Sequence, residues 1–256
     1  MKIHQIRNAT VVIEAAGQRI LLDPMMGPVG SLTPYSFIRF RARRNPLIGL
    51  PPNTDALLRG ITAGLISHTH FGMDCDHLDA AGAKALAGVP VYCNAPDEAG
   101  LKKRGMQTVA LQIGRESAFP GGTITPVAAS HGGCVMSKVM GPGAGYVLRL
   151  SGEPSLYITG DTILTPDVRA VLADMRPDVC LLPCGSAQLD VGGPVLMPTD
   201  EILEFVRLAP GRVVANHLEA LNHCPTTRDM LRSLLTTAGL ETKVTIPADG
   251  SPAEIS

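Results

Sequence analysis

The stretch from Ser67 to Asp79 constrains the fold more than any other part of the sequence. It gathers three of the seven histidines and three aspartates within thirteen residues. The run 64–66 before it is short and apolar, as in a buried strand, and residues 78–86 after it have the pattern of a helix. α/β proteins tend to place their chemistry at such strand ends. The sequence therefore predicts an α/β fold with this stretch at the rim of a sheet.

The spacing within this stretch suits metal ligands. His68 and His70 are two residues apart, so in an extended segment both rings leave the same side of the backbone, with Cα atoms roughly 6.6 Å apart. Two imidazole nitrogens at about 2.1 Å from one ion can close that gap. Asp76 and His77 are adjacent and diverge, so they can serve a second ion. The alternative, a solvated loop in which Asp76 caps the helix, does not account for this density of ligand types.

If residues 72–75 are left out, the stretch resembles the His-x-His-x-Asp-His signature of the metallo-β-lactamase-fold hydrolases. Within that superfamily the chain is most similar to the branch that contains the ascorbate-6-phosphate lactonase. The resemblance runs from about Ile6 to Ile246 and implies a four-layer αββα sandwich. No linker or repeat divides the 256 residues, so we expect a single domain over 1–256.

Three later positions match the ligands of that family. His131 follows a predicted strand and precedes Gly-Gly, Asp161 ends another strand, and His217 ends a third. The resemblance implies that Asp161 bridges two ions and, with Asp76, is a catalytic carboxylate. The implied ligands are His68, His70 and His131 for the first ion, and Asp76, His77 and His217 for the second. Three histidines with one open position are what a catalytic zinc site requires.

The four residues Gly72–Cys75 depart from the family signature. They either bulge outward, leaving Asp76 and His77 in place, or displace that pair and let Asp74 bind a metal. We favour the bulge, because Gly72 gives the backbone freedom that a bulge needs. Asp74 then orients ligands or meets solvent, and Cys75 remains a candidate ligand or redox-sensitive thiol.

Further candidates lie outside the signature. In the family, the aspartate at the position of Asp23 supports the metal-site loops, although an aspartate before Pro24 also suits a turn. Glu219, Asn222 and His223 follow His217 and are expected to orient ligands or contact substrate.

The segment at about 24–60 is predicted to be irregular, because six prolines interrupt it. It holds three aromatic residues interleaved with arginines, and long irregular segments are usually functional loops. One interpretation is a substrate-covering loop in which Arg41 and Arg43 meet an anionic group. The other is a subunit contact, giving a homo-oligomer, or a solvated basic surface.

Composition and charge exclude several classes of function. Lys+Arg 22 against Asp+Glu 23 leaves a net charge of -1, so no overall field favours nucleic acid or an anionic membrane. No leader-like segment or membrane-spanning run is present, and we expect a cytoplasmic protein. The six cysteines are scattered and expected to be reduced. Cys180 and Cys184, roughly 13 Å apart in an extended strand, are too distant to share an ion.

The expected chemistry is metal-dependent hydrolysis of a small molecule, without nucleic acid or membrane as partner. Two divalent ions, zinc with manganese or iron as alternatives, share a hydroxide that attacks an ester, lactone or phosphoester. No Gly-x-Ser-x-Gly elbow is present. Three alternatives remain: an iron-dependent oxidoreductase on the same fold, a phosphodiesterase or nuclease, and a non-catalytic metal-binding protein with an altered second site.

Overall fold

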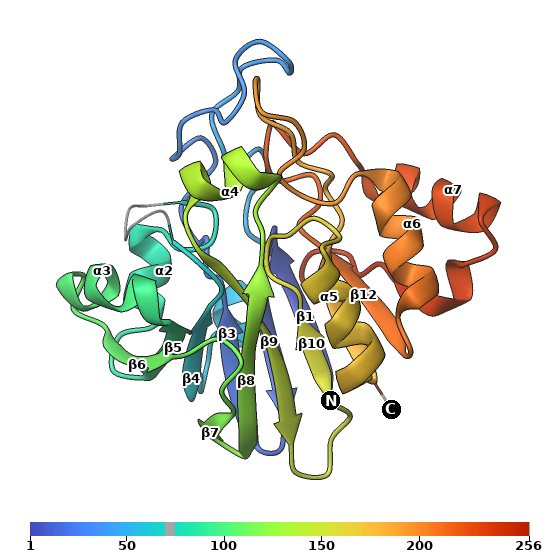
Figure 1. Cartoon of the computed structure of the whole chain (residues 1–256). Coiled ribbons are helices and arrows are strands. Elements are labelled where there is room, and N and C mark those ends of the chain that lie inside the picture. The colour runs from blue at the N-terminus through green and yellow to red at the C-terminus, as the bar shows by residue number, and fades with distance from the viewer. Residues whose placement is uncertain (70–74, 256) are drawn as a thin grey trace.

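A computed structural model describes residues 1–69 and 75–255 of the chain. Within these residues two seven-stranded sheets pack face to face, and helices cover their outer faces (Figure 1). The αββα sandwich predicted from the sequence is therefore confirmed. Both termini lie at the end of the molecule opposite the long loops (Figure 1).

The first sheet combines antiparallel and parallel strands. β14 pairs with β1, and β1, β2 and β3 form an antiparallel meander. β3, β4, β5 and β6 then run parallel. The strands are β1 Lys2–Arg7, β2 Thr10–Ala15, β3 Gln18–Leu22, β4 Ala63–Ile66, β5 Pro90–Asn94, β6 Gln107–Leu111 and β14 Pro252–Glu254.

The second sheet repeats this arrangement. β7, β8, β9 and β10 are antiparallel, and β10, β11, β12 and β13 are parallel. Its parallel strands, like those of the first sheet, end on the side that carries the long loops. The strands are β7 Ser117–Phe119, β8 Gly122–Ala129, β9 Gly143–Leu150, β10 Leu156–Ile158, β11 Val179–Pro183, β12 Arg212–Asn216 and β13 Val244–Thr245.

The helices are short and follow the strands. The α-helices are α1 Thr54–Leu57, α2 Ala80–Ala85, α3 Glu98–Lys103, α4 Cys134–Met140, α5 Pro166–Ala170, α6 Thr199–Leu208 and α7 Arg228–Thr237. A π-helical turn, Val171–Met175, extends α5, and 3₁₀ turns cover Ala95–Asp97 and Glu241–Lys243. None of the helices in the described residues is long and apolar enough to cross a membrane.

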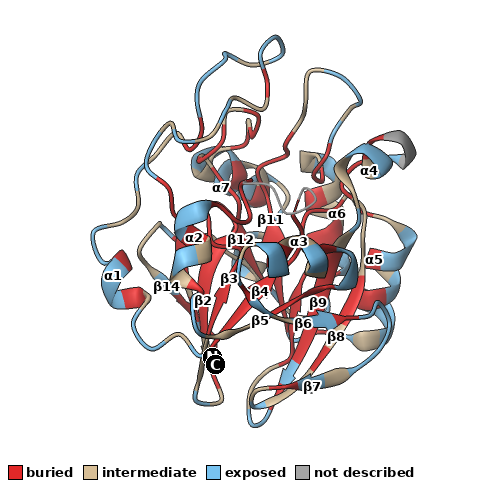
Figure 2. Cartoon of the chain, turned by 90° about the vertical axis from the view of Figure 1, so that its left-hand side faces the viewer, coloured by how far each residue is buried: buried red, intermediate tan, exposed pale blue. Residues whose placement is uncertain are grey.

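The apolar core lies in three layers. One buried cluster, which includes Ile13, Leu65 and Val214, fills the space between the two sheets. A second, which includes Phe205, packs the second sheet against its helices, and a third, which includes Leu78, does the same for the first sheet. Figure 2 shows this burial concentrated in the strands. Burying each large aliphatic side chain contributes roughly 1.5–3 kcal/mol, so the strand ends rest on a rigid base.

Two local features differ from what the sequence alone suggests. Residues 141–145 are rich in glycine, as in a turn, but β9 already begins at Gly143. A side chain at Gly145 would come within 2.7 Å of the Thr159 carbonyl oxygen, so glycine here permits close strand pairing rather than a turn. The edge strand β14 was not predicted, because it has three residues and begins with proline.

Among the described residues, 23–53 contain no helix or regular strand. The buried guanidinium of Arg7 supports the base of this segment by donating to the carbonyl oxygens of Met25, Gly27 and Ile48. The cysteine thiols of Cys75, Cys93, Cys180, Cys184 and Cys224 are free and buried, as expected.

Candidate metal centre

Four strand ends bring the predicted ligands together at the loop end of the molecule. β4 leads to His68, β8 to His131, β10 to Asp161 and β12 to His217. All four side chains are buried. Because parallel strands end at the same edge of a sheet, residues more than 100 positions apart in the sequence share one site.

The first group of potential ligands consists of Asp76, His77, Asp161 and His217. Asp161 Oδ2 lies 3.1 Å from His77 Nε2 and 3.6 Å from His217 Nε2. Asp76 Oδ2 lies 3.2 Å from His217 Nε2. One donor atom from each of the four residues falls within 4.8 Å of all the others, which is close enough to surround one cation.

The second group consists of His68, His131 and Asp161. His131 Nε2 lies 3.2 Å from Asp161 Oδ2. The rings of His68 and His131 meet edge to face with centroids 5.2 Å apart. Asp161 belongs to both groups, as the resemblance implied. His70 and Asp74 lie outside the described residues.

The buried carboxylates and imidazoles compensate each other's charge. Burial alone would raise the pKa of Asp161, but His77 and His217 hold it well below its usual value. Asp76 behaves in the same way. Conversely, burial would lower the pKa of His77, but Asp161, Asp23 and Asp76 raise it well above the usual value. Positive charge between the carboxylates therefore stabilises their ionised form.

A divalent cation fits this donor set. The donors are imidazole nitrogens and carboxylate oxygens, the ligand types of zinc and related metals. Asp161 Oδ1 is also buried and accepts no hydrogen bond from the described residues. A buried oxygen without a partner needs an explanation, and a bound cation supplies one.

Asp23 orients the His77 ring through Nδ1, the nitrogen opposite the one that lies in the first ligand group. His77 Nδ1 lies 2.9 Å from Asp23 Oδ2, and the backbone N–H and hydroxyl of Ser67 donate to the two carboxylate oxygens. Such a carboxylate fixes the ring of a metal-binding histidine so that its other nitrogen faces the ion. The supporting role expected for Asp23 agrees with these contacts.

Two further residues that contact the candidate ligands, Asn8 and Cys224, were not predicted from the sequence. Asn8 donates to the carbonyl oxygen of Asp76, and its side chain is 3.4 Å from His217 Nε2. Cys224 Sγ lies 3.6 Å from His217 Nδ1. Burial opposes ionisation of this thiol, but His223 and His217 lower its pKa to about 7.

Residues around the insertion take distinct roles. Asp76 belongs to the first ligand group and does not cap α2. The N-cap is Asp79, whose carboxylate accepts a hydrogen bond from the backbone N–H of Gly82. Cys75 belongs to neither group, and burial raises its pKa to about 11. Residues 72–74 lie outside the described residues, so the choice between the bulge and a displaced pair stays a prediction.

The arginine segment, residues 35–44, is clamped by Asp190. This carboxylate accepts hydrogen bonds from the Ser36 hydroxyl and from three consecutive backbone N–H groups. These bonds hold the pKa of Asp190 below its usual value. Arg39 and Arg44 bind carbonyl oxygens within the loops. The segment is therefore an ordered structure.

Arg41 and Arg43 instead line a groove of about 320 Å³. Neither side chain forms an ion pair with the described residues. Cys224 also lines the groove and touches His217, so the groove and the ligand groups share a wall. Two positive charges thus face open space next to the site.

Glu219 and Asn222 also border the groove, but their polar atoms are engaged. Glu219 accepts from the backbone and guanidinium of Arg228. The Asn222 side chain accepts from Tyr35 and Asn45 and donates to the Ser36 carbonyl oxygen. Both residues fix loops, and their expected contact with substrate stays a prediction. His223 is buried, with its ring edge-on to Tyr35.

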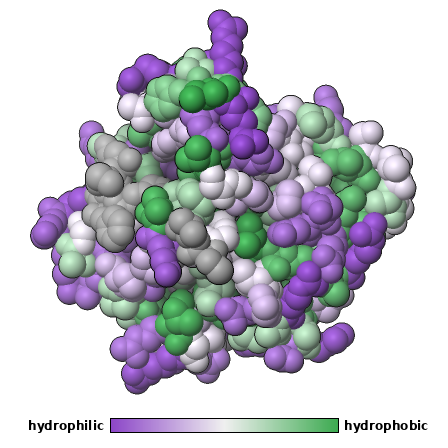
Figure 3. Space-filling view, turned by 45° about the horizontal axis from the view of Figure 1, so that its top comes forward, coloured by the Kyte–Doolittle hydropathy of each residue, from purple (hydrophilic) through white to green (hydrophobic). Residues whose placement is uncertain are grey.

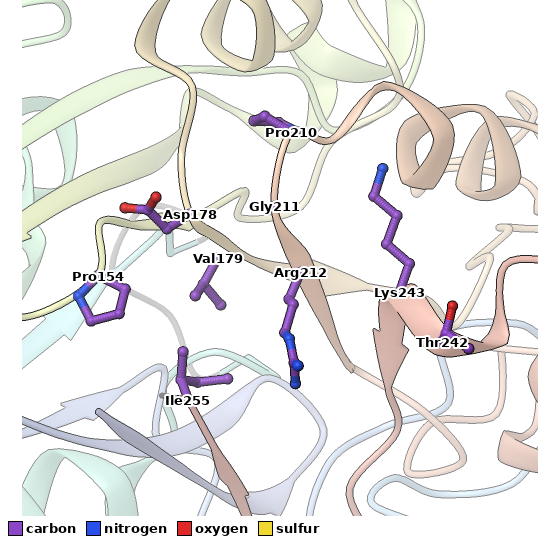
Figure 4. Close-up of a pocket in the computed structure, with 9 residues that line it drawn as sticks. All are labelled: Pro154, Asp178, Val179, Pro210, Gly211, Arg212, Thr242, Lys243 and Ile255. Carbon is purple, nitrogen blue, oxygen red and sulfur yellow. The ribbon is translucent and has the colours of Figure 1, made fainter.

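A separate cavity of about 690 Å³ lies at the opposite ends of β11 and β12 (Figure 4). Its charged groups do not converge: Asp178 binds Ser155, and Lys243 donates to the Arg207 carbonyl oxygen. In Figure 4 the side chains of Arg212 and Lys243 point in different directions. We therefore place the candidate site at the loop end.

Comparison with known proteins agrees with this geometry. Residues 18–218 match the model of the beta-lactamase superfamily domain. The chain belongs to this superfamily. UPF0173 protein YddR of Bacillus subtilis (strain 168) is 28% identical over 255 residues, covering 98% of both chains. Several other relatives are named UPF0173 metal-dependent hydrolases, so the chain is a member of a family of metal-dependent hydrolases.

Two solved structures match over the whole chain. The isothiocyanate hydrolase from Delia radicum gut bacteria is 30% identical with a TM-score of 0.89, and covers 100% of this chain and 99% of its own. A possible metal-dependent hydrolase from Veillonella parvula DSM 2008 is 26% identical with a TM-score of 0.91 and the same coverage. The finer placement beside the ascorbate-6-phosphate lactonase stays a prediction.

Proposed function

We propose that this protein is a hydrolase with a binuclear metal centre that acts on a small electrophilic molecule. The observation that carries the proposal is Asp161, a buried carboxylate common to two adjacent ligand groups. His68, His70, His131 and Asp161 would hold one ion, and Asp76, His77, Asp161 and His217 the other. Zinc suits the donors best, with manganese or iron as alternatives.

Ions in this position would lower the pKa of a shared water toward about 7 and polarise the substrate. The chain's own residues prepare the site for that chemistry. Asp23 and Ser67 fix the His77 ring, and Asn8 fixes the backbone of Asp76. A buried apolar cluster that includes Met25, Val195 and Cys224 adjoins the site through the contact of Cys224 with His217.

A carbon electrophile is the substrate class that we favour. The relative with 30% identity over the full chain is named an isothiocyanate hydrolase, and an isothiocyanate carries an electrophilic carbon between nitrogen and sulfur. Esters and lactones offer a similar carbon to the same nucleophile. We therefore propose hydrolysis of an isothiocyanate, ester or lactone. Hydrolysis of a phosphoester instead would show that the substrate is a phosphorus electrophile.

The groove beside His217 supports an anionic substituent on the substrate. Arg41 and Arg43 line it, and guanidinium groups bind carboxylate or phosphate well. The loop end shows polar and apolar residues interspersed rather than one large apolar face (Figure 3). With a net charge of -1, we propose a small molecule as partner, with neither nucleic acid nor membrane.

The test is metal analysis combined with a substrate panel. Protein purified without added metal is expected to hold close to two equivalents, and to hydrolyse at least one of an isothiocyanate, a lactone, an ester and a phosphoester. His68→Ala should lose at least one equivalent and most activity. The matched control is His4→Ala, because His4 lies on β1 outside both ligand groups.

Other results would replace the proposal. Two iron equivalents with oxygen-dependent turnover and no hydrolysis would indicate an oxidoreductase. A single equivalent without turnover would indicate a binding protein with an altered second site. Unchanged metal content in His68→Ala would show that His68 is not a metal ligand and that the proposed assignment of the ligands is wrong.

A further inference from the structure

The backbone around His217 has an unusual conformation. His217 has φ +57° and Glu219 has φ +63°, which places both residues in the left-handed region. Residues with a side chain seldom adopt this conformation, and they keep it only where the surrounding structure holds them. Because His217 is also a candidate metal ligand, the contacts that hold this loop bear directly on the site.

Two contacts constrain the backbone at His217 itself. Its backbone N–H donates to the carbonyl oxygen of Asn8 at 2.9 Å. On the other side Gly185 packs so closely that a Cβ atom there would lie 2.3 Å from the His217 carbonyl oxygen. These contacts position the peptide groups on either side of the His217 Cα atom.

The side chain of Glu219 is held by Arg228. Glu219 Oε1 accepts from the backbone N–H of Arg228 at 2.7 Å, and Oε2 accepts from Nη1 of Arg228 at 2.5 Å. Nε of Arg228 donates to the Pro247 carbonyl oxygen at 3.0 Å, and Nη2 donates to Asp249 Oδ1. Arg228 begins α7, and its side chain is only 12% exposed. The arginine thus ties Glu219 to the start of α7 and to residues 247–249.

This ion pair closes the loop of residues 219–228, which packs against the His217 ring. Within the loop, Cys224 Sγ lies 3.6 Å from His217 Nδ1. The other ring nitrogen, Nε2, lies 3.2 Å from Asp76 Oδ2 in the first ligand group. Because Glu219 is only two residues beyond His217, a change in its backbone conformation would turn the ring away from that group.

We propose that Arg228 is a positioning residue for the candidate metal centre, acting through Glu219 to hold the His217 loop in its left-handed conformation. The inference rests on the proposed metal ligands but not on the reaction that the centre carries out. Without this contact the ring would have to be ordered when the ion binds, which lowers affinity. The second ligand group does not include His217, so its ion should be held as before.

Hydrogen exchange of the purified protein tests the loop whether or not metal is bound. The His217 N–H should exchange on the order of 10-fold faster in Arg228→Gln and in Glu219→Ala than in wild type, because the loop opens more often. Arg169→Gln is the matched control, since it also breaks an arginine–glutamate pair, the one between Arg169 on α5 and Glu204 on α6. It should leave exchange at His217 unchanged.

A comparison of alanine and glycine at position 219 isolates the backbone role. Both substitutions remove the carboxylate, but only glycine adopts a positive φ readily. Glu219→Gly should therefore keep exchange at His217 closer to that of wild type than Glu219→Ala does. Equal effects of the two substitutions would show that the carboxylate does not maintain this conformation.

Chelator competition on the zinc-loaded protein gives a second measurement. In Arg228→Gln, one zinc equivalent should be lost at a chelator concentration about 10- to 100-fold lower than in wild type, as is typical when a residue that orients a metal ligand is replaced. The other equivalent should be lost at the wild-type concentration. Arg228→Lys keeps the charge but not the planar fork of donors, so it should recover only part of the difference.

The outcomes separate this inference from the proposed function. Unchanged exchange at His217 in Arg228→Gln, or equal weakening of both zinc equivalents, would show that Arg228 does not position the ligand. If the wild type binds no metal, the proposed function is wrong, while hydrogen exchange still decides whether Arg228 holds the loop. If Arg228→Gln does not fold, Arg228→Lys and Glu219→Gly provide the same comparison.

Discussion

The ligand groups and the arginine segment lie side by side at the loop end but are built in opposite ways. In the ligand groups each side chain is buried and oriented by another side chain, as His77 is by Asp23. In the arginine segment the backbone is fixed by Asp190, while Arg41 and Arg43 remain exposed. The difference shows where precision is needed, since metal ligands tolerate little displacement and an anionic substituent can be met by flexible cations.

The largest expected effect comes from the carboxylate that both ligand groups use. Asp161→Ala should reduce bound metal by more than one equivalent and lower kcat/KM on the order of 10³-fold or more, because both ions lose a ligand. The control is Asp167→Ala, an exposed carboxylate on α5. Loss of only one equivalent would show that the two groups are independent.

A smaller effect is expected at the insertion. Asp76→Ala should cost on the order of 10²-fold in activity, since a carboxylate at the first group is removed. Asp74→Ala should cost far less. The reverse order would mean that the insertion displaces Asp76 and that Asp74 is the ligand. The assignment of the second ligand group, which contains His68 and His131, would not be affected.

The arginine segment should respond through substrate affinity. The double substitution of Arg41→Gln and Arg43→Gln should raise KM by about 10-fold for an anionic substrate and change kcat little, because binding in the ground state is lost. A neutral substrate should be unaffected. Arg59→Gln with Arg115→Gln is the control for net charge. If KM is unaltered and the oligomeric state changes, the segment is a subunit contact.

The smallest expected effect is on stability, and it concerns two aspartates that hold loops in place, Asp97 and Asp190. Asp97 accepts from the backbone and hydroxyl of Thr69, and burial raises its pKa to about 6. Because folding raises this pKa, the free energy of unfolding should fall as the pH rises from about 4 to about 6, by up to about 3 kcal/mol. Asp190, whose pKa is lowered, should contribute no change there.

Denaturant unfolding at several pH values measures this difference. Asp97→Asn should flatten the curve between pH 4 and pH 6, whereas Asp190→Asn should leave its slope in that range unaltered. An equal slope in wild type and Asp97→Asn would show that the carboxyl does not titrate there.

Three of the candidate ligands could be predicted because each one follows a recognisable apolar strand. His131, Asp161 and His217 all lie where a run of buried residues ends, and their types restrict the chemistry. The clamps could not be predicted. Asp190 and its partner Ser36 are 154 positions apart, and Asn222 is an ordinary polar residue until the fold brings it against Tyr35. Such contacts depend on tertiary packing, which leaves no local pattern.

The shared position of Asp161 also bears on how the proposed centre would take up two metals. An ion bound by one group would neutralise the carboxylate that the other group needs, so the two affinities would not be independent. We expect the first ion to weaken binding of the second, because the shared carboxylate is already partly neutralised. A metal titration followed by calorimetry should then show two unequal dissociation constants.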